Sequence, residues 1–303
     1  MSKFKTSIGG QAVMEGITMK GPKKTCLAVR LPDGSIKTEI TETRQNPAAK
    51  LPIVRGVAAM VIALSEGYQH LMDSAENAFP DMEEDKFDLW LKKHFGEKVS
   101  SVVGMLAAVL AGFLSVCLFI LLPTFLTGLL DKVVPLGGLK TVVEGLLKVV
   151  IFVCYLVAVS RMKEIKRVFS YHGAEHKTIF CYEAGEALTV ENVRKHSRFH
   201  PRCGTSFLFI TVIISILVFS FVPWTSTLMR MLYKLICLPL VMGLSYECIR
   251  FAGKHDNLFS RVLSAPGLWV QHLTVFEPDD GMIECAIAAM TAVIPENSEE
   301  AAL

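Results

Sequence analysis

The residues best suited to chemistry stand together near the middle of the chain, in the run Tyr171-His172-Gly173-Ala174-Glu175-His176-Lys177. Histidines four positions apart share one face of a helix, about one turn apart, so His172 and His176 can reach one divalent cation. Glu175 directly precedes the second histidine, which gives the H-x-x-E-H order of inverted zinc peptidases. The spacing predicts a metal held by the two imidazoles, with Glu175 as the general base toward water.

A second cluster, His200-Pro201-Arg202-Cys203-Gly204, favours this interpretation over its alternative, a helix whose polar residues face water or lipid headgroups. Imidazole and thiolate both suit zinc, so we expect His200 or Cys203 to supply a third ligand. All four residues would form a closed, structural site, whereas three ligands plus water are typical of a catalytic site. Cys203 as a small apolar residue at a helix start is the other interpretation. We expect one divalent ion, zinc, per chain.

A glycine-rich segment, Gly9 to Gly16 (GGQAVMEG), is the next unusual feature. Three glycines around one acid indicate a backbone that turns tightly or approaches another group closely. No Gly-Lys-Ser/Thr sequence follows, so the segment is not a phosphate-binding Walker loop. Glu15 is a further candidate metal ligand, and a turn-forming role is the favoured alternative.

The elements that must position these residues include membrane spans. The chain has 303 residues, of which 51% are hydrophobic, and its mean hydropathy is +0.43. These values exclude an ordinary soluble domain. A span takes ~20 residues, and four apolar segments are long enough: 99–122, 142–160, 205–222 and 231–249. The shorter apolar run 53–64 carries Arg55 and predicts an interfacial, re-entrant or buried helix.

Basic residues predict the orientation of the spans. Nine Lys and Arg residues lie between the second and third spans, against two between the first and second and one between the third and fourth. The basic loop and both termini should therefore be cytoplasmic. No apolar run follows the basic start, so we expect no cleavable signal peptide. None of the eight cysteines falls in an outer loop, which indicates no disulfide framework.

The remaining regions carry secondary-structure signals. Residues 25–31 and 35–41 alternate around Pro32-Asp33-Gly34, which predicts a hairpin, and a helix should run from Pro52 to about Ala78. An acidic linker at 81–85 and an amphipathic piece at 87–95 should follow.

In the tail we expect a break at Pro266-Gly267, a helix over 281–293 and disorder over 296–303. Glu247 and Arg250, at the inner end of the fourth span, should pair or face a cavity.

These features divide the chain into five regions: an N-terminal cytoplasmic region with a hairpin and amphipathic helices (1–98), the first two spans (99–160), a basic loop with the His/Glu/Cys motifs (161–204), the last two spans (205–249) and a cytoplasmic tail (250–303). We therefore expect an all-α membrane protein with four transmembrane helices and a small α+β cytoplasmic portion. The spans contain few ionisable residues, which disfavours an ion pathway through a single chain.

Three motifs, GGQAVMEG (9–16), YHGAEHKTI (171–179) and HPRCGTSF (200–207), resemble those of the YqhQ family, and the resemblance covers nearly the whole chain. This family consists of bacterial multi-spanning membrane proteins, a domain of unknown function. The resemblance implies a protein of the bacterial plasma membrane that has been described as a predicted metal-dependent enzyme. That description rests on the same histidines, and the family implies no particular reaction or substrate.

The function that these patterns favour is a metal-dependent hydrolase at the cytoplasmic face of the plasma membrane, acting on a peptide, a lipid or a phosphoester. A non-enzymatic membrane protein is the alternative: a metal-stabilised scaffold, or a transporter or channel whose pore a homo-oligomer would line. The basic run Arg194 to Arg198 predicts contact with anionic lipid headgroups, and a phosphate-bearing substrate site is its sharper interpretation. The bilayer is the main expected partner, and no nucleic acid partner is expected.

Overall fold

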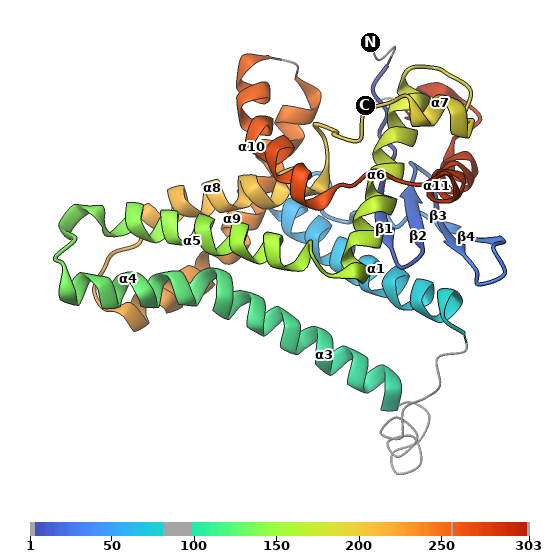
Figure 1. The fold of residues 1–303 in the computed structure, drawn as a ribbon. Coiled ribbons are helices and arrows are strands. Elements are labelled where there is room, and N and C mark those ends of the chain that lie inside the picture. Colours follow the sequence, from blue (N-terminus) through green and yellow to red (C-terminus); the bar gives the residue numbers. More distant parts are fainter. Residues whose placement is uncertain (1–3, 81–98, 256, 302–303) are drawn as a thin grey trace. The chain divides into compact units, whose positions relative to one another are not determined.

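The chain is mainly helical with one small sheet at its N-terminal end (Figure 1). The structure, a computed structural model, describes residues 4–80, 99–255 and 257–301. It divides into two units, one that contains the sheet and one that consists of helices. The sheet unit comprises Met1–Phe79, Leu156–Ile214 and Pro239–Leu303, and the helical unit comprises Pro80–Tyr155 and Ser215–Leu238.

The sheet has four antiparallel strands in the order β1-β2-β3-β4: β1 (Gly9–Val13), β2 (Gly16–Lys20), β3 (Lys24–Arg30) and β4 (Ile36–Glu42). The predicted hairpin is confirmed as β3 and β4, with Cys26 opposite Ile40 and Gly34 at a φ of 86° in the turn. The glycine-rich segment forms the hairpin of β1 and β2. Its turn places Glu15 at a φ of 49°, in the left-handed region that tight hairpin turns require.

Both faces of the sheet are covered by helices. On one face, Ile17, Met19, Cys26 and Ala28 pack with α6 (Lys163–Glu183) and α11 (Asp280–Val293) in the main hydrophobic core. On the other face, Leu27 and Val29 pack near the end of α1 (Val54–Ala78). Neighbouring residues of a strand point to opposite faces, so β3 is apolar at consecutive positions because both of its faces are buried.

Long apolar helices make up most of the rest of the chain. They are α3 (Val99–Val116), a π-helical turn (Cys117–Leu121), α4 (Leu122–Val133), α5 (Lys140–Val159), α8 (Gly204–Ser220) and α9 (Thr227–Lys254). Within the described residues, three helical segments are long and apolar enough to cross a membrane: Val102–Val133, Gly137–Val159 and Thr227–Ala252. The third predicted span falls on α8, which has 17 residues and lies at the lower limit for a span.

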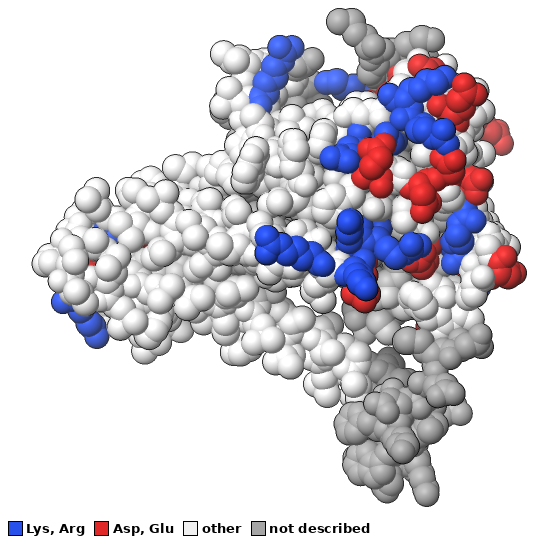
Figure 2. Space-filling view, viewed as in Figure 1, with Lys and Arg blue, Asp and Glu red and all other residues white. Residues whose placement is uncertain are grey.

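The surface of these helices fits a lipid environment. Met105, Leu106, Val109 and Phe113 of α3 are each more than half exposed, which is unusual for a soluble protein. In Figure 2 the visible surface of α3, α4 and α5 carries few charged side chains, whereas Lys, Arg, Asp and Glu gather over α6, α7 (Val190–Arg194) and α11. The three spanning candidates and this apolar surface indicate a membrane protein.

The few ionisable residues of the spans include a buried group of charges in the helical unit. Glu144 of α5 pairs with Arg230 and Lys234 of α9, and all three side chains are at most 4% exposed. Lys148, also buried, donates to Ser215 Oγ at 2.8 Å. Both helices carry their charges at i and i+4, the spacing that places them on one helix face. This repeated spacing is the sequence signal from which the buried charges could have been predicted.

The C-terminal tail differs from two of the expectations drawn from the sequence. Two other predicted segments lie outside the described residues. Pro266 does not break the chain's helix, because α10 runs from Leu258 to Thr274 through it. The predicted C-terminal helix is confirmed as α11, with Asp279 accepting from the Met282 amide at its start. The end of the chain forms a short 3-10 helix over Ser298–Ala301, and the buried Ala301 accepts a hydrogen bond from the Ser7 amide. The predicted linker at 81–85 and amphipathic piece at 87–95 are not among the described residues.

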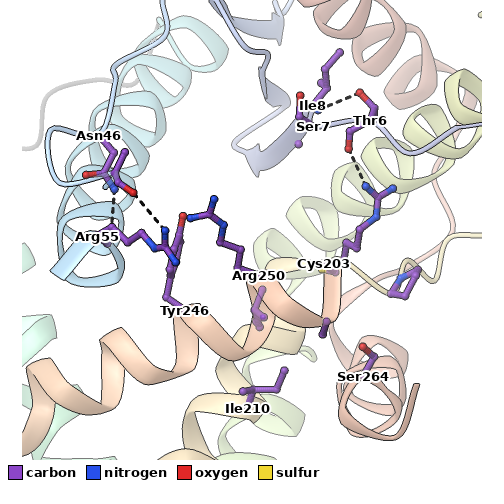
Figure 3. Close-up of a pocket in the computed structure, with 16 residues that line it drawn as sticks. Thr6, Ser7, Ile8, Asn46, Arg55, Cys203, Ile210, Tyr246, Arg250 and Ser264 are labelled. Atoms are coloured by element: carbon purple, nitrogen blue, oxygen red, sulfur yellow. Dashed lines mark hydrogen bonds between the residues drawn. The ribbon is translucent and has the colours of Figure 1, made fainter. Parts of the chain in front are cut away.

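A cavity of about 630 Å³ lies within the sheet unit (Figure 3). Its walls come from the segment before β1, the start of α1, the loop that precedes α8, and the last turns of α9. Cys203 is one of the lining residues. The cavity therefore adjoins the residues singled out for metal binding.

Candidate metal centre

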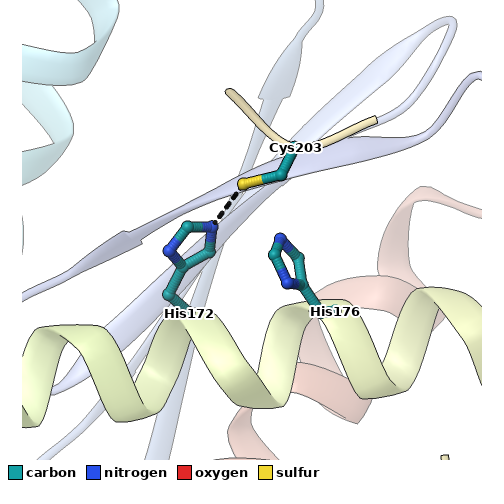
Figure 4. Close-up of side chains that lie close together, drawn as sticks. All are labelled: His172, His176 and Cys203. Atoms are coloured by element: carbon teal, nitrogen blue, oxygen red, sulfur yellow. Dashed lines mark hydrogen bonds between the residues drawn. The ribbon is translucent and has the colours of Figure 1, made fainter. Parts of the chain in front are cut away.

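Helix α6 carries the H-x-x-E-H run as predicted. Tyr171 and Ala174 pack into the main core, which holds α6 firmly against the sheet. Gly173 permits the close passage of the chain after α10, because a Cβ atom at this position would collide with the Phe276 carbonyl oxygen. The sequence between the two histidines thus serves packing, while His172 and His176 project from the same side of the helix (Figure 4).

Three of the four predicted ligands meet in space. His172 Nε2 lies 3.1 Å from Cys203 Sγ, and one donor atom from each of His172, His176 and Cys203 lies within 4.8 Å of the other two. Figure 4 shows the two imidazoles standing side by side on α6, with the thiol facing them. His176 and Cys203 are buried, and His172 is partly buried. Two imidazoles and a thiolate are a donor set that zinc prefers.

The hydrogen bonds of the two α6 histidines orient them for ligation. His172 Nδ1 lies 3.2 Å from the Thr274 carbonyl oxygen, and His176 Nδ1 lies 2.5 Å from that of Arg198. A carbonyl oxygen only accepts, so each Nδ1 carries the proton and each Nε2 presents a lone pair. Metal-ligating histidines typically donate their other ring N–H in this way. His176 Nε2 is buried and has no hydrogen-bond partner among the described residues, so the residues fit a metal.

His200 lies beside this group in a different state. Its ring centre is 5.6 Å from that of His176, but its donor atoms are not within the group of three. The Arg202 amide donates to His200 Nδ1 at 3.2 Å, which leaves the proton on Nε2 and makes that atom a poor ligand. Burial, and then the neighbouring His176, hold the pKa of His200 well below its usual range. His200 therefore remains a neutral neighbour of the group.

Glu175 points toward the sheet. Its side chain is buried, accepts a hydrogen bond from the Gly10 amide, and has an unpartnered Oε2 among the described atoms. Burial is the main cause that raises the pKa of this carboxyl group, and the nearby His172 opposes the rise. Gly10 makes the approach of β1 possible, because a Cβ atom there would lie 3.0 Å from Glu175 Cδ and 2.7 Å from the Thr18 carbonyl oxygen.

The loop that brings Cys203 to α6 is held by residues that sequence reasoning did not single out. The buried Gln271 of α10 accepts from the His200 amide and donates to the His200 carbonyl oxygen, both at 2.8 Å. Arg202 pairs with the buried Glu183 and donates to the Thr6 carbonyl oxygen at 2.8 Å. A glutamine within the apolar stretch 268–276 was the available signal for the first contact, since buried amides are nearly always hydrogen-bonded.

The other candidate residues have structural partners. Both Glu15 oxygens accept from Arg167 of α6 at 2.5 Å, so this carboxylate ties the β1–β2 turn to α6 and lies outside the group of donor atoms. In the basic run, Arg194 pairs with Asp280, and Arg198 lies near Glu277. Ion pairs within the protein thus already engage part of this run.

A second group of ligand types, Cys181, Glu186 and His196, also lies within 4.8 Å. Burial raises the pKa of the Cys181 thiol to about 11, so the thiol stays protonated near neutrality and is a weak ligand. His196 Nε2 is 3.2 Å from Glu186, and this contact accounts for the grouping without a metal.

Comparison with known proteins agrees with the resemblance noted from the motifs. Residues 51–296 match the family model described as "Protein of unknown function (DUF1385)". The chain is also similar to the "Uncharacterized protein YqhQ" of Bacillus subtilis (strain 168), with 36% identity over 305 residues that cover 97% of this chain and 95% of that protein. No solved structure matches the chain. The family match covers most of the chain and the relative nearly all of it, so the chain belongs to the DUF1385 family that includes YqhQ.

Proposed function

We propose that this protein is a metal-dependent hydrolase-like enzyme at the cytoplasmic face of the bacterial plasma membrane, with zinc as its metal. One observation carries the proposal. One donor atom from each of His172, His176 and Cys203 lies within 4.8 Å of the other two, while both Nδ1 atoms are held by backbone carbonyl oxygens. Three protein ligands leave one position of a tetrahedral metal open, which is typical of catalytic zinc sites.

A zinc ion held by these residues would act as a Lewis acid and make water a stronger acid. The protein's own contribution is then orientation and proton transfer. Glu175, one residue before His176, is the candidate general base, and its Oε2 is not engaged by another described group. The Gly10 amide, which bonds to this carboxylate, fixes its direction. A nearby dication favours the ionised carboxylate that a base requires, against the effect of burial.

We also propose four membrane spans with both termini in the cytoplasm. The three helices long enough to cross a membrane support three of the spans. For the remaining span, α8 contains 17 residues with no charged side chain, a length of about 25 Å at the rise of an α-helix. The excess of Lys and Arg between α5 and α8 supports an inner location for that loop, and with it for the candidate metal ligands.

The role of Glu175 separates an enzyme from a metal-stabilised scaffold. We expect Glu175→Gln to keep the metal and the protein level but to abolish activity, because an amide of the same shape cannot accept the proton. His176→Ala is the matched variant that should lose the metal and lower the protein level, since metal binding contributes to folding. The test is complementation of a deletion strain with each variant, with membrane protein levels measured in the same cells.

Full complementation by Glu175→Gln, together with loss of function in His176→Ala, would contradict the hydrolase and support the scaffold. Failure of Glu175→Gln at a normal protein level and with normal metal content would support the hydrolase.

A further inference from the structure

The cavity beside the metal ligands combines two kinds of wall. Apolar side chains, among them Ile8, Ile210 and Ile249, line one part of it. Arginines from three different segments, Arg55, Arg202 and Arg250, also line it. Figure 3 shows the Arg250 side chain extending from α9 toward the space beside Thr6 to Ile8. Such a wall fits a ligand that has an anionic group and an apolar part.

The three arginines differ in whether the protein already neutralises them. Arg55 forms a bidentate ion pair with Glu247, whose oxygen also accepts from the Ile53 amide. Arg202 pairs with Glu183. Arg250 is exposed to the cavity, and within the described residues neither an ion pair nor a hydrogen bond engages its guanidinium. Of the two expectations for Glu247 and Arg250, that they pair or face a cavity, Arg250 meets the second: it lines the cavity while Glu247 pairs with Arg55, so the Arg250 guanidinium is available to a ligand.

The cavity's place in the chain indicates where the ligand comes from. Tyr246, Ile249, Arg250 and Ala252 line it, and they are the last turns of the spanning candidate Thr227–Ala252. The end of a span lies at the boundary between hydrocarbon and headgroups. A guanidinium at this level binds phosphate oxygens well, because its planar fork matches their geometry and it is weakly hydrated.

We propose that this cavity binds the phosphate headgroup of an anionic phospholipid, with Arg250 as the phosphate ligand and the isoleucine wall against the start of the acyl chains. Because Cys203 lines the same cavity, the bound phosphoester lies next to the metal ligands. Its role as the substrate class rests on the proposed function, whereas its binding does not require the metal.

The test measures binding to the full chain purified in dodecyl maltoside. Dihexanoyl phosphatidylglycerol, dihexanoyl phosphatidylcholine and inorganic phosphate are titrated separately by calorimetry, and zinc content is determined on the same samples. We expect phosphatidylglycerol to bind more tightly than either of the other two. Arg250→Gln should weaken its binding by about tenfold, the effect of losing a charge-assisted hydrogen bond.

Arg161→Gln is the control, because Arg161 is exposed, follows the helix α5 and does not line the cavity. It should leave binding unchanged. Ile249→Ala should weaken the binding of phosphatidylglycerol without affecting the binding of inorganic phosphate. Equal affinity of wild type and Arg250→Gln would overturn the proposal, as would equal affinity for phosphatidylcholine or for inorganic phosphate. If the protein contains no zinc but binds the lipid through Arg250, the lipid site is supported and the proposed enzyme is rejected. If the protein contains zinc but does not bind the lipid, the lipid site is rejected and the metal centre is retained.

Discussion

At the scale of single residues, hydrogen bonds distinguish the three histidines that stand near one another. His172 and His176 use Nδ1 to donate to backbone carbonyl oxygens, whereas His200 uses Nδ1 to accept from the Arg202 amide. The first arrangement leaves Nε2 with a lone pair that could bind a metal, and the second leaves Nε2 protonated. Three histidines of the same sequence region therefore have two different chemical states, which the spacing of the residues does not specify.

Gln271 provides a test of how the Cys203 loop is held. Gln271→Leu would leave the buried His200 amide without a partner and the His200 carbonyl oxygen with the Cys203 amide alone, at a cost of about 1–3 kcal/mol in the free energy of unfolding. Zinc affinity should fall as well, because Cys203 follows His200 by three residues in the same loop. Denaturant unfolding and zinc titration of the purified variant measure the two effects. Gln45→Leu, at an exposed glutamine, should change neither, and a silent Gln271→Leu would show that the loop is held in another way.

The sequence predicted the donor groups that meet beside α6 better than it predicted the residues that hold them there. The i, i+4 spacing of His172 and His176 followed from helix geometry alone, and Cys203 was available by residue type. The close approach of Gly10 to Glu175, and the double hydrogen bond of Gln271, depend on which segments fold together. No pattern in a single chain encodes such long-range pairing, so these contacts required the structure.

At the scale of elements, the sequence pattern predicted the turns and helix starts that depend on residues close together in the chain. Pro32-Asp33-Gly34 between two alternating runs specified the β3–β4 hairpin, and Pro52 opened a helix that the structure begins at Val54. Strands β1 and β2 were missed because their glycines and buried threonine interrupt the alternation of apolar residues. The expectation of a break at Pro266 was wrong, because α10 continues through this residue.

The buried charges of the helical unit give a prediction about how α5 and α9 hold together. Glu144→Gln would leave Arg230 and Lys234 without a counter-ion, and breaking a buried pair in this way costs about 3–5 kcal/mol. Thermal and denaturant unfolding in detergent should show the loss. Asp131→Asn is the matched control: its pair with Lys140 is partly exposed, so its loss should change the stability far less than the loss of the buried pairs. Equal stability of both variants would mean that Glu144 does not stabilise the unit.

At the scale of the whole molecule, charge placement predicts that the loop between α5 and α8 is cytoplasmic. Two single-cysteine variants in a background without other cysteines test this: Gly138→Cys, where a new Cβ meets nothing within 4 Å, and Lys195→Cys, at an exposed lysine. An impermeant maleimide should label the first in intact cells and the second only after permeabilisation. Labelling of Lys195→Cys in intact cells would reverse the orientation and move the metal ligands to the outer face.

The metal is the central claim, and elemental analysis of gently purified protein tests it most directly. We predict about one zinc per chain in wild type, none in His176→Ala, and an unchanged amount in His200→Ala, because among the described residues His172, His176 and Cys203 bring donor atoms within 4.8 Å of one another and His200 is not in that group. Wild-type protein that contains no metal and takes up no added zinc would contradict the account.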